Sequence, residues 1–514
     1  MPTVRLSVPR IGIVGSGPAG FYTAYKLLGL VQNAIVDMYE ALPVPFGLVR
    51  YGVAPDHAQV KVKNPTLHKF EEVASSSRFN FIGNISVGRD ISLSEMKMAY
   101  HGLVLAYGAS KDKKLGIEGE NTLNGVYSAR SFVGWYNGLP EFRNLEPSLK
   151  CGDVATIIGQ GNVALDIARI LLCDFDHLRK TDIPEYALQA LHQSKIRNVR
   201  IVGRRGLLQA AFTVKELREL SRLSNVTFVS AGVIPTVSES GDLTRAQRRM
   251  IELMNSLVSN SALARSWSLD FLRSPRKLLA KEADSKSLGS VEYEVNMLQS
   301  DGNGKVGAVG TGTFVMEPTD LLFKSIGYQS KPLEGYQEIS LPFDVRRGFV
   351  PNVSGKVIDP VSGDFLPGVY VSGWVKRGPT GVIASTMQDA FETAERVALD
   401  WMERGLFLQP KEEACGGWEE LREVTARRGL FPVSWQGWKK IDAAEVQRGA
   451  IAGKEREKVV NVQDMLNILE DYRGCQRFNS FSTSSAIASA LVSPGDSMPR
   501  RLTMPGCGSC MIKS

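Results

Sequence analysis

The clearest pattern of apolar and polar positions lies near the start of the chain. An apolar run over residues 11–14 leads into the glycine-rich segment 15–20, and apolar residues then recur at helical spacing over residues 21–30. A second strand-like segment, residues 34–39, is apolar except for Asp37 and ends at Glu40. Short continuous apolar runs indicate strands that are buried on both faces, whereas residues three and four apart share one face of a helix. The pattern therefore predicts a strand, a tight turn, a helix and a second, parallel strand.

The same pattern returns in the middle of the chain. Residues 154–158 form another apolar run, residues 159–164 have the sequence GQGNVA, and residues 165–172 have helical spacing. The next apolar strand, residues 199–203, follows after an insertion that we place at about residues 174–195. Strands that alternate with helices are typical of α/β proteins. We therefore predict an α/β fold with two Rossmann-like dinucleotide-binding domains.

The glycines of the first turn have distinct physical roles in such a unit. Gly15 turns the chain, Gly17 lets backbone N–H groups approach a pyrophosphate, and Gly20 lets the helix pack close to the strand. Unpaired N–H groups and the helix dipole attract the phosphates. Glu40 is placed to accept hydrogen bonds from ribose hydroxyls and to repel a 2′-phosphate, so the first site should take FAD or NAD and not NADP.

The second turn, with Gly159 and Gly161, lacks such an acid. Its next strand leads instead into Arg204 and Arg205. Two guanidinium groups at that strand end suit an adenosine 2′-phosphate, since arginine binds phosphate through charge-assisted hydrogen bonds. The sequence therefore predicts NADPH at the second site, and the alternative is a solvated arginine pair.

The remaining segments indicate how the domains are arranged. Residues 41–57, with three prolines and two glycines, predict a shaped loop without helix or strand. Residues 102–109 predict a buried strand, and residues 368–374 predict a strand that returns to the first domain. We expect a first domain in two parts, residues 1–110 and 331–473, with a second domain, residues 111–330, between them. Residues 474–514 should form a low-complexity, disordered tail.

Composition limits the classes of protein that fit. The 514 residues are 43% hydrophobic and 22% charged, with a net charge of +7, and no apolar run is long enough to cross a membrane. Nothing indicates nucleic-acid binding. Six scattered cysteines suit a reducing compartment, and the CxxC of residues 507–510 lacks further ligands for zinc. Arg5 and Arg10, without an acid nearby, fit either a very short organelle presequence or a plain N-terminus.

Two further features concern binding. Glu216, in a helical pattern over residues 210–222, would contact a nicotinamide ribose or lie on the surface. Arg245 and Arg249 share one face of a predicted helix. That face would dock an acidic protein, or it is simply solvated.

Together these segments resemble the adrenodoxin reductases, the mitochondrial-type ferredoxin–NADP reductases with a glutathione-reductase-like fold. The resemblance runs from about residue 9 to about residue 469. It is carried by VGSGPAGFYTA (14–24), VPFGLVRYGVAPDH (44–57), SFVGWYNGLP (131–140), GQGNVALDIARILL (159–172), VGRRGLLQAAFTVKELREL (202–220), SIGYQS (325–330) and SGWVKRGPTGVIAST (372–386).

The resemblance implies site residues and a reaction. The expected FAD contacts are Ala19, Glu40, Leu48, Val87, Trp374, Gly381, Val382 and Ile383. The expected NADPH contacts are Gly159, Gln160, Gly161, Asn162, Arg204, Arg205 and Glu216, with Gly381 as a further candidate. Electrons would pass from NADPH through FAD, one at a time, to an acidic [2Fe–2S] ferredoxin that docks at Arg245 and Arg249.

His57 and Asp166 are the candidate proton-handling residues near the flavin, and the alternative is a structural role between the domains. We expect a monomer in the mitochondrial matrix. Trp374 stands where many flavin reductases have an aspartate, so stacking would replace a carboxylate there. A disulfide-type oxidoreductase is an alternative, but residues 1–150 contain no cysteine. An electron-input module of a larger complex would need N-terminal cysteine clusters, which are also absent.

Overall fold

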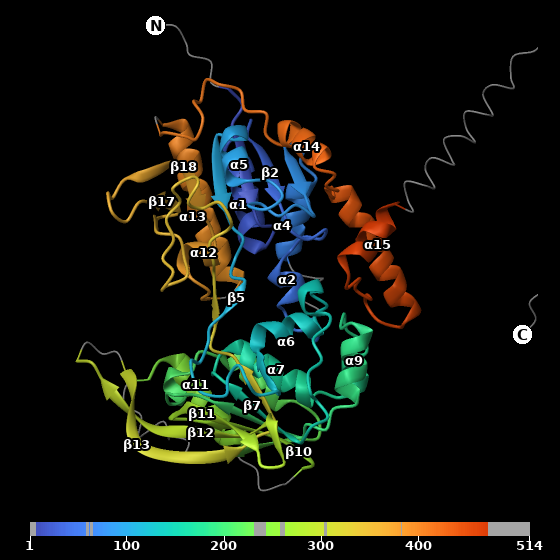
Figure 1. Cartoon of the computed structure of the whole chain (residues 1–514), viewed down its shortest axis with the longest axis vertical. Coiled ribbons are helices and arrows are strands. Elements are labelled where there is room, and N and C mark those ends of the chain that lie inside the picture. Colours follow the sequence, from blue (N-terminus) through green and yellow to red (C-terminus); the bar gives the residue numbers. More distant parts are fainter. Residues whose placement is uncertain are drawn as a thin grey trace, which may run out of the picture. The chain divides into compact units, whose positions relative to one another are not determined.

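The computed structural model describes residues 7–57, 61, 65–230, 243–257, 263–302, 306–381, 383–403 and 405–470 (Figure 1). Two parallel sheets lie within one compact unit, Met1–Leu466. Strands and helices alternate along most of this unit. The predicted α/β class is therefore confirmed.

The first sheet has the strand order β16-β17-β18-β4-β1-β2-β3. The strands β18, β4, β1, β2 and β3 are parallel, and β16 and β17 are antiparallel additions at one edge. Because β18 pairs with β4, the chain returns to its first sheet after more than two hundred residues elsewhere. In chain order the strands are β1 (Arg10–Val14), β2 (Ile35–Tyr39), β3 (Phe79–Ile82), β4 (Gly102–Leu105), β16 (Asn352–Val353), β17 (Lys356–Ile358) and β18 (Phe365–Val371).

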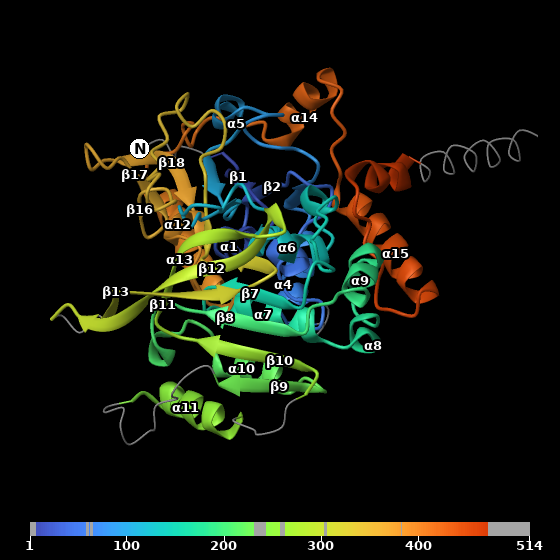
Figure 2. The same ribbon diagram turned by 60° about the horizontal axis from the view of Figure 1, so that its bottom comes forward.

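The second sheet is parallel throughout, with the order β6-β14-β7-β8-β10-β9 (Figure 2). Its strands are β6 (Val126–Ser128), β7 (Val154–Ile158), β8 (Asn198–Val202), β9 (Val226–Ser230), β10 (Arg265–Asp270) and β14 (Leu321–Lys324). A three-stranded antiparallel sheet adjoins it in sequence, formed by β11 (Arg273–Lys281), β12 (Asp284–Ser300) and β13 (Val306–Pro318). The strands β5 (Lys111–Asp112) and β15 (Tyr328–Gln329) pair with each other, where the chain leaves and re-enters the first sheet.

Helices cover both sheets. In the first, α1 (Pro18–Leu30) packs against α4 (Pro65–Ala74) and α13 (Ile383–Met402). In the second, α7 (Asn162–Leu172) packs against α10 (Val214–Ser221), and Phe132, Trp135, Ile157 and Trp267 are buried in its core. The other helices are α2 (Leu48–Tyr51), α5 (Leu93–Ala99), α6 (Ala129–Tyr136), α8 (Phe175–Leu178), α9 (Glu185–His192), α11 (Arg245–Leu257), α12 (Trp374–Arg377), α14 (Trp418–Arg427) and α15 (Trp435–Ile451).

The prediction that residues 41–57 contain no helix is wrong. Gly47 has a positive φ of 46° and is the N-cap of the single turn α2. A Cβ atom on Gly47 would lie 3.2 Å from the Cα of Gly17, so this turn lies directly on the first glycine turn. The glycine therefore both reverses the chain and permits the close approach, which a local pattern of apolar residues does not reveal.

A buried network of charges joins distant segments. Lys61 Nζ lies 2.9 Å and Lys458 Nζ lies 2.7 Å from the carboxylate of Asp182, and all three side chains are at most 7% exposed. Arg50 Nη2 lies 2.5 Å from Glu445 Oε1, also in the interior. Two lysines share one carboxylate, so their positive charges lower the pKa of Asp182 well below its usual range despite its burial.

We searched the helices of the described residues for a membrane-spanning segment and found none. None of these helices combines enough length with enough apolar character to cross a bilayer.

Candidate active site

Three segments meet at the first glycine turn. A Cβ atom on Gly15 would lie 2.6 Å from the carbonyl oxygen of Ala106, and one on Gly20 would lie 2.1 Å from that of Gly15. Neither position accepts a side chain. A Cβ atom on Gly17 would meet nothing within 4 Å, and no side chain caps α1 at Gly17. The turn therefore leaves uncapped N–H groups beside open space, which is the arrangement that a pyrophosphate requires.

Glu40 lies beside this turn, as its position at the end of β2 predicts. Its Oε2 accepts hydrogen bonds from the backbone N–H of Ser16 (3.2 Å) and from Ser16 Oγ (2.6 Å), and Oε1 accepts one from the N–H of Leu42 (3.2 Å). Burial raises the pKa of the Glu40 carboxyl, and these hydrogen bonds counter the rise. The side chain is thus fixed next to the turn.

The return segment also reaches the first turn. A Cβ atom on Gly373 would lie 2.5 Å from the Cβ of Ala19, so Gly373 packs closely on the side chain of Ala19 in α1. Trp374, the first residue of α12, comes next in the chain. The N–H of Gly373 donates to Asp389 Oδ2 at 2.7 Å. Gly381 is exposed with a φ of +85°, and Ile383 begins α13. Val382 lies outside the described residues.

Two further predicted FAD contacts lie in different surroundings. The side chain of Leu48 is 41% exposed at the start of α2, next to the first glycine turn. Val87 is buried in the core cluster that contains Val14 and Tyr39, the last residues of β1 and β2. Both therefore lie near the carboxyl end of the first sheet, where ligands bind in open α/β sheets.

The second glycine turn repeats the geometry of the first. Gly159 has a φ of +120°, and a Cβ atom there would lie 2.1 Å from the carbonyl oxygen of Ser325. Gly161 is the N-cap of α7 without a side-chain cap, and a Cβ atom on it would meet nothing within 4 Å. Gln160 Nε2 donates to the carbonyl of Asp270 at 3.2 Å. Asn162 Oδ1 accepts from the N–H of Thr213 at 2.9 Å, which ties the turn to α10.

Arg204 and Arg205 follow β8 after Gly203, at the same end of the sheet as the second turn. Arg204 is exposed and Arg205 is half-buried. Their backbone carbonyls accept hydrogen bonds from Asn296 Nδ2 and from the N–H of Leu272, at 2.9 and 3.3 Å. Within the described ranges, no hydrogen bond or ion pair engages either guanidinium group. Both groups are thus positioned through their backbones and available to an anion.

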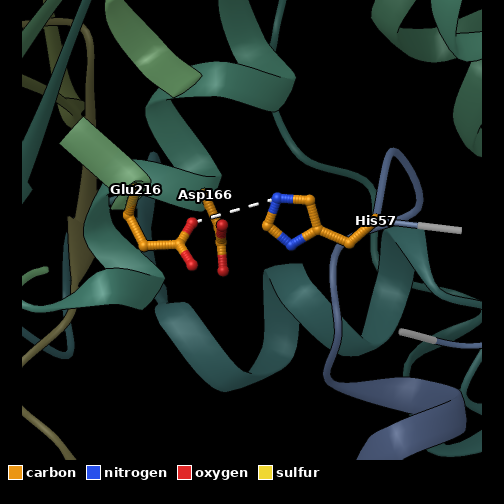
Figure 3. A group of neighbouring side chains, drawn as sticks. All are labelled: His57, Asp166 and Glu216. Carbon is orange, nitrogen blue, oxygen red and sulfur yellow. Dashed lines mark ion pairs between the residues drawn. The ribbon is translucent and has the colours of Figure 1, made fainter. Parts of the chain in front are cut away.

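His57, Asp166 and Glu216 come together although they are far apart in the sequence. One nitrogen or oxygen atom from each lies within 4.8 Å of the other two, and the two carboxylates face the imidazole ring (Figure 3). His57 Nε2 lies 3.9 Å from Glu216 Oε2 and 2.7 Å from Glu219 Oε2. The predicted proton-handling residues are therefore neighbours.

Arg169 occupies the centre of this cluster, with a side chain that is 3% exposed. Its Nε donates to Asp56 Oδ2 at 2.5 Å, and its Nη2 donates to Asp56 Oδ1 at 3.1 Å and to Asp166 Oδ1 at 2.8 Å. Arg169 thus offsets part of the negative charge of Asp56, Asp166, Glu216 and Glu219 around it.

The pKa values of the carboxyl groups in the cluster shift in different directions. Burial opposes ionisation of Asp56, but the hydrogen bonds and charge of Arg169 outweigh it and lower the pKa. Burial raises the pKa of Asp166, and it also raises that of Glu216, with the charge of Asp166 as a further cause. Glu216 Oε2 and Arg169 Nη1 are buried atoms without a hydrogen-bond partner, 3.6 Å apart. The two atoms form a buried ion pair at a distance longer than a hydrogen bond.

A cavity of about 340 Å³ adjoins this cluster and includes His57, Arg169 and Glu219 in its lining. His177 and Arg222 also line it. The wall of the cavity therefore contains titratable side chains of the cluster together with others that lie outside it.

The predicted docking residues lie on α11. Arg245 and Arg249 are both exposed, and they are one helical turn apart in this helix. Met250, Ile251 and Met254 are the buried side of the same helix. The two arginines therefore lie on the solvent-facing side of α11.

Known proteins resemble the chain over nearly its whole length. The mitochondrial NADPH:adrenodoxin oxidoreductase of Bos taurus is 45% identical over 473 residues, which cover 90% of this chain and 92% of the bovine protein. That of Arabidopsis thaliana is 44% identical over 470 residues, covering 89% and 94%. The chain belongs to the NADPH:adrenodoxin oxidoreductase family. No family model matches it.

A solved structure supports the same assignment. Mycobacterium tuberculosis FprA in complex with NADPH has a TM-score of 0.79 and 37% identity to the chain, and the match covers 90% of this chain and 99% of FprA. The predicted resemblance is therefore confirmed. Membership of the NADPH:adrenodoxin oxidoreductase family makes the protein an oxidoreductase and favours this function over a disulfide-type oxidoreductase or an electron-input module.

Four residues of the site were not predicted from the sequence: Asp56, Arg169, Glu219 and Asp389. A signal for Arg169 was present, since it is an arginine in the otherwise apolar stretch of α7 and lies three residues after Asp166. Buried arginines require carboxylate partners, and an i, i+3 pair is the first to look for. The partners Asp56 and Glu219 lie on other segments and had no local signal.

Proposed function

We propose that this protein transfers electrons from NADPH, through a bound FAD, one at a time to an acidic [2Fe–2S] ferredoxin. The observation that carries the proposal is the 45% identity to an NADPH:adrenodoxin oxidoreductase over 473 residues, which cover 90% of this chain. The proposal adds to family membership the cofactor, the residues that hold it and the partner.

The first glycine turn fits the pyrophosphate of FAD. The open space at Gly17, the uncapped amino end of α1 and the fixed carboxylate of Glu40 match a diphosphate followed by a ribose. Leu48 and Trp374 would flank the ring system from α2 and α12. When bound, FAD supplies the chemistry that converts a two-electron donor into single-electron transfers.

The second glycine turn fits NADPH. The open space at Gly161 and the uncapped start of α7 would receive the pyrophosphate, and Arg204 and Arg205 would bind the 2′-phosphate. Glu216, whose side chain is 14% exposed, would accept a hydrogen bond from the nicotinamide ribose. The protein thus orients the donor, and orientation supplies a large part of the rate enhancement.

His57 and Asp166 would manage the proton that remains. Each NADPH oxidised by two one-electron acceptors releases one proton overall, which must leave a partly buried site. The Nε2 of His57 lies 2.7 Å from Glu219, which lines the adjoining cavity. These residues therefore offer an acceptor and a route outward.

The exposed arginines of α11 would receive the partner. Arg245 and Arg249 give a positive face, which attracts an acidic protein over distances of about 8 Å at physiological ionic strength. The curated relatives from Bos taurus and Arabidopsis thaliana are named as mitochondrial proteins. We propose the same location for this one.

Spectra of the purified protein test the proposal. A yellow protein whose flavin absorbance is bleached by NADPH, and which reduces cytochrome c only when a [2Fe–2S] ferredoxin is added, is the expected result. Reduction of a disulfide substrate without ferredoxin would favour the disulfide-type alternative. Protein that remains colourless after incubation with FAD would contradict the proposed cofactor.

A further inference from the structure

The two arginines that follow β8 have their backbones held by residues of a different sheet. The carbonyl oxygen of Arg204 accepts a hydrogen bond from Asn296 Nδ2 at 2.9 Å. The carbonyl oxygen of Arg205 accepts one from the N–H of Leu272 at 3.3 Å. Asn296 lies in β12, and Leu272 is the residue before β11. The antiparallel sheet β11-β12-β13 therefore supports the backbone from which both guanidinium groups extend.

The side-chain amide of Asn296 is fully used in this support. Its Nδ2 donates to the carbonyl of Arg204 and also to Ser274 Oγ in β11, at 2.8 Å. An amide nitrogen has two N–H groups, so both are engaged. Asn296 is only 5% exposed, and water therefore has little access to replace either bond. The amide thus ties the turn after β8 to two strands of the antiparallel sheet.

Leu272 reaches Arg205 through an uncommon backbone conformation. Its φ of 57° lies in the left-handed region, which residues with a side chain rarely adopt. The carbonyl of Leu272 accepts a hydrogen bond from the backbone N–H of Asn296 at 2.8 Å, while its own N–H donates to Arg205. Such a conformation persists where the surrounding contacts impose it. Asn296 therefore supports Arg204 directly and Arg205 through Leu272.

The guanidinium groups themselves have no comparable support. In the part of the chain that the structure describes, no hydrogen bond or ion pair engages either of them. Their positions therefore follow from the backbone of the turn. A hydrogen bond to a phosphate requires a donor–acceptor distance of about 2.7–3.2 Å, so a small displacement of that backbone weakens the contact.

We propose that Asn296 is a positioning residue for nucleotide specificity, which holds Arg204 and Arg205 where their guanidinium groups meet the adenosine 2′-phosphate of NADPH. The inference rests on the proposed function, which places the 2′-phosphate at these two arginines. Asn296 acts through their backbones and not by contact with the nucleotide. Its effect should therefore require both the 2′-phosphate on the ligand and the arginines on the protein.

Steady-state reduction of ferricyanide gives the first test. Asn296→Leu removes both N–H donors and keeps a branched side chain, and Asn296→Ala removes them with a smaller one. The KM for NADPH should rise about tenfold in each, roughly the effect of losing one hydrogen bond. The kcat should not change, because the 2′-phosphate is bound equally before and during hydride transfer. The KM for NADH, which lacks this phosphate, should change by less than about twofold.

Calorimetric titration of the FAD-containing protein gives a readout without turnover. The Kd for adenosine 2′,5′-bisphosphate should rise about tenfold in N296L, whereas the Kd for 5′-AMP should stay as in the wild-type protein. In R204Q/R205Q, the addition of N296L should cause no further loss, because residues that act through one another are not additive. A merely structural role would weaken both ligands or add its full effect in this background.

Asn198→Leu is the matched control. Asn198 begins β8, at the end of the strand away from Arg204. Its Nδ2 donates to Asp153 Oδ2 at 3.2 Å, and its Oδ1 accepts from Ser266 Oγ at 2.8 Å. This variant therefore also removes an asparagine that joins β8 to its neighbours. We expect wild-type discrimination between NADPH and NADH. N296A serves if N296L does not fold.

Equal losses for NADPH and NADH in the Asn296 variants, or wild-type binding of adenosine 2′,5′-bisphosphate by both of them, would overturn the inference. A full further loss on adding N296L to R204Q/R205Q would do the same. If R204Q/R205Q alone binds adenosine 2′,5′-bisphosphate as the wild-type protein does, the proposed 2′-phosphate site itself fails, and the role of Asn296 fails with it.

Discussion

Replacing Arg204 and Arg205 by glutamine should remove the preference for NADPH over NADH. Both residues follow β8, at the strand end next to the second glycine turn. Their backbones are held by Asn296 and Leu272, so the strand end should keep its course when the guanidinium groups are removed. Since no described group pairs with either side chain, the substitution leaves no buried partner unpaired.

The size of the effect follows from the number of contacts. A hydrogen bond to a charged group contributes about 1.5–3 kcal/mol, and phosphate contacts of exposed arginines lie at the lower end. Two arginines, one exposed and one half-buried, should together contribute about 2–4 kcal/mol. At about 1.4 kcal/mol for each factor of ten, kcat/KM for NADPH should fall by roughly 30- to 1,000-fold. That for NADH, which lacks the 2′-phosphate, should change by less than about twofold.

Steady-state reduction of ferricyanide with each nucleotide measures this without a protein partner. Arg200→Gln is the control, because Arg200 lies in β8 itself, a few residues before the pair, and is paired with Glu317 at 2.9 Å. It should lower both activities equally or not at all. Equal losses for NADPH and NADH in the double variant would show that the two arginines do not bind the 2′-phosphate.

Three other perturbations test separate parts of the molecule. Reversing Arg245 and Arg249 to glutamate should raise the KM for ferredoxin and flatten the salt dependence of cytochrome c reduction, because steering by exposed charges is screened at high ionic strength. Ferricyanide turnover, which needs no protein partner, is the control. Unchanged cytochrome c kinetics would place docking elsewhere. Removing residues 474–514 should leave FAD content and ferricyanide activity intact, as their composition provides little apolar area to bury; loss of flavin would contradict this. Asp182→Asn should destabilise the protein by about 3–5 kcal/mol in denaturant unfolding, since it leaves buried lysines without their carboxylate. Because the folded-state pKa of Asp182 is lowered, its contribution is present at neutral pH and is lost as pH falls below its ordinary value of about 3.9; Asp176→Asn, at a side chain that is 83% exposed, should change stability by less than about 0.5 kcal/mol.

The two dinucleotide-binding units could be predicted because each is local. A buried strand, a turn with glycine at fixed positions and an amphipathic helix occupy about twenty consecutive residues. Each of these parts has its own pattern of apolar residues and glycines within that stretch. The positive φ of Gly159 and the lack of space at Gly15 and Gly20 follow from the close packing of strand, turn and helix. The chemistry of the strand ends, at Glu40 and at Arg204, is also adjacent in the sequence to the strands that carry it.

The tertiary structure alone decided which distant groups meet. His57 and Asp166 are more than one hundred residues apart, and Arg169 and Glu219 join them only because α7 and α10 pack together beside the segment that holds Asp56 and His57. The turn at Gly47 likewise depends on contact with Gly17. A local pattern records which face of an element is buried, but not which charges share the same interior. The stability and protonation of those charges depend on their partners, and the fold of the whole chain supplies them.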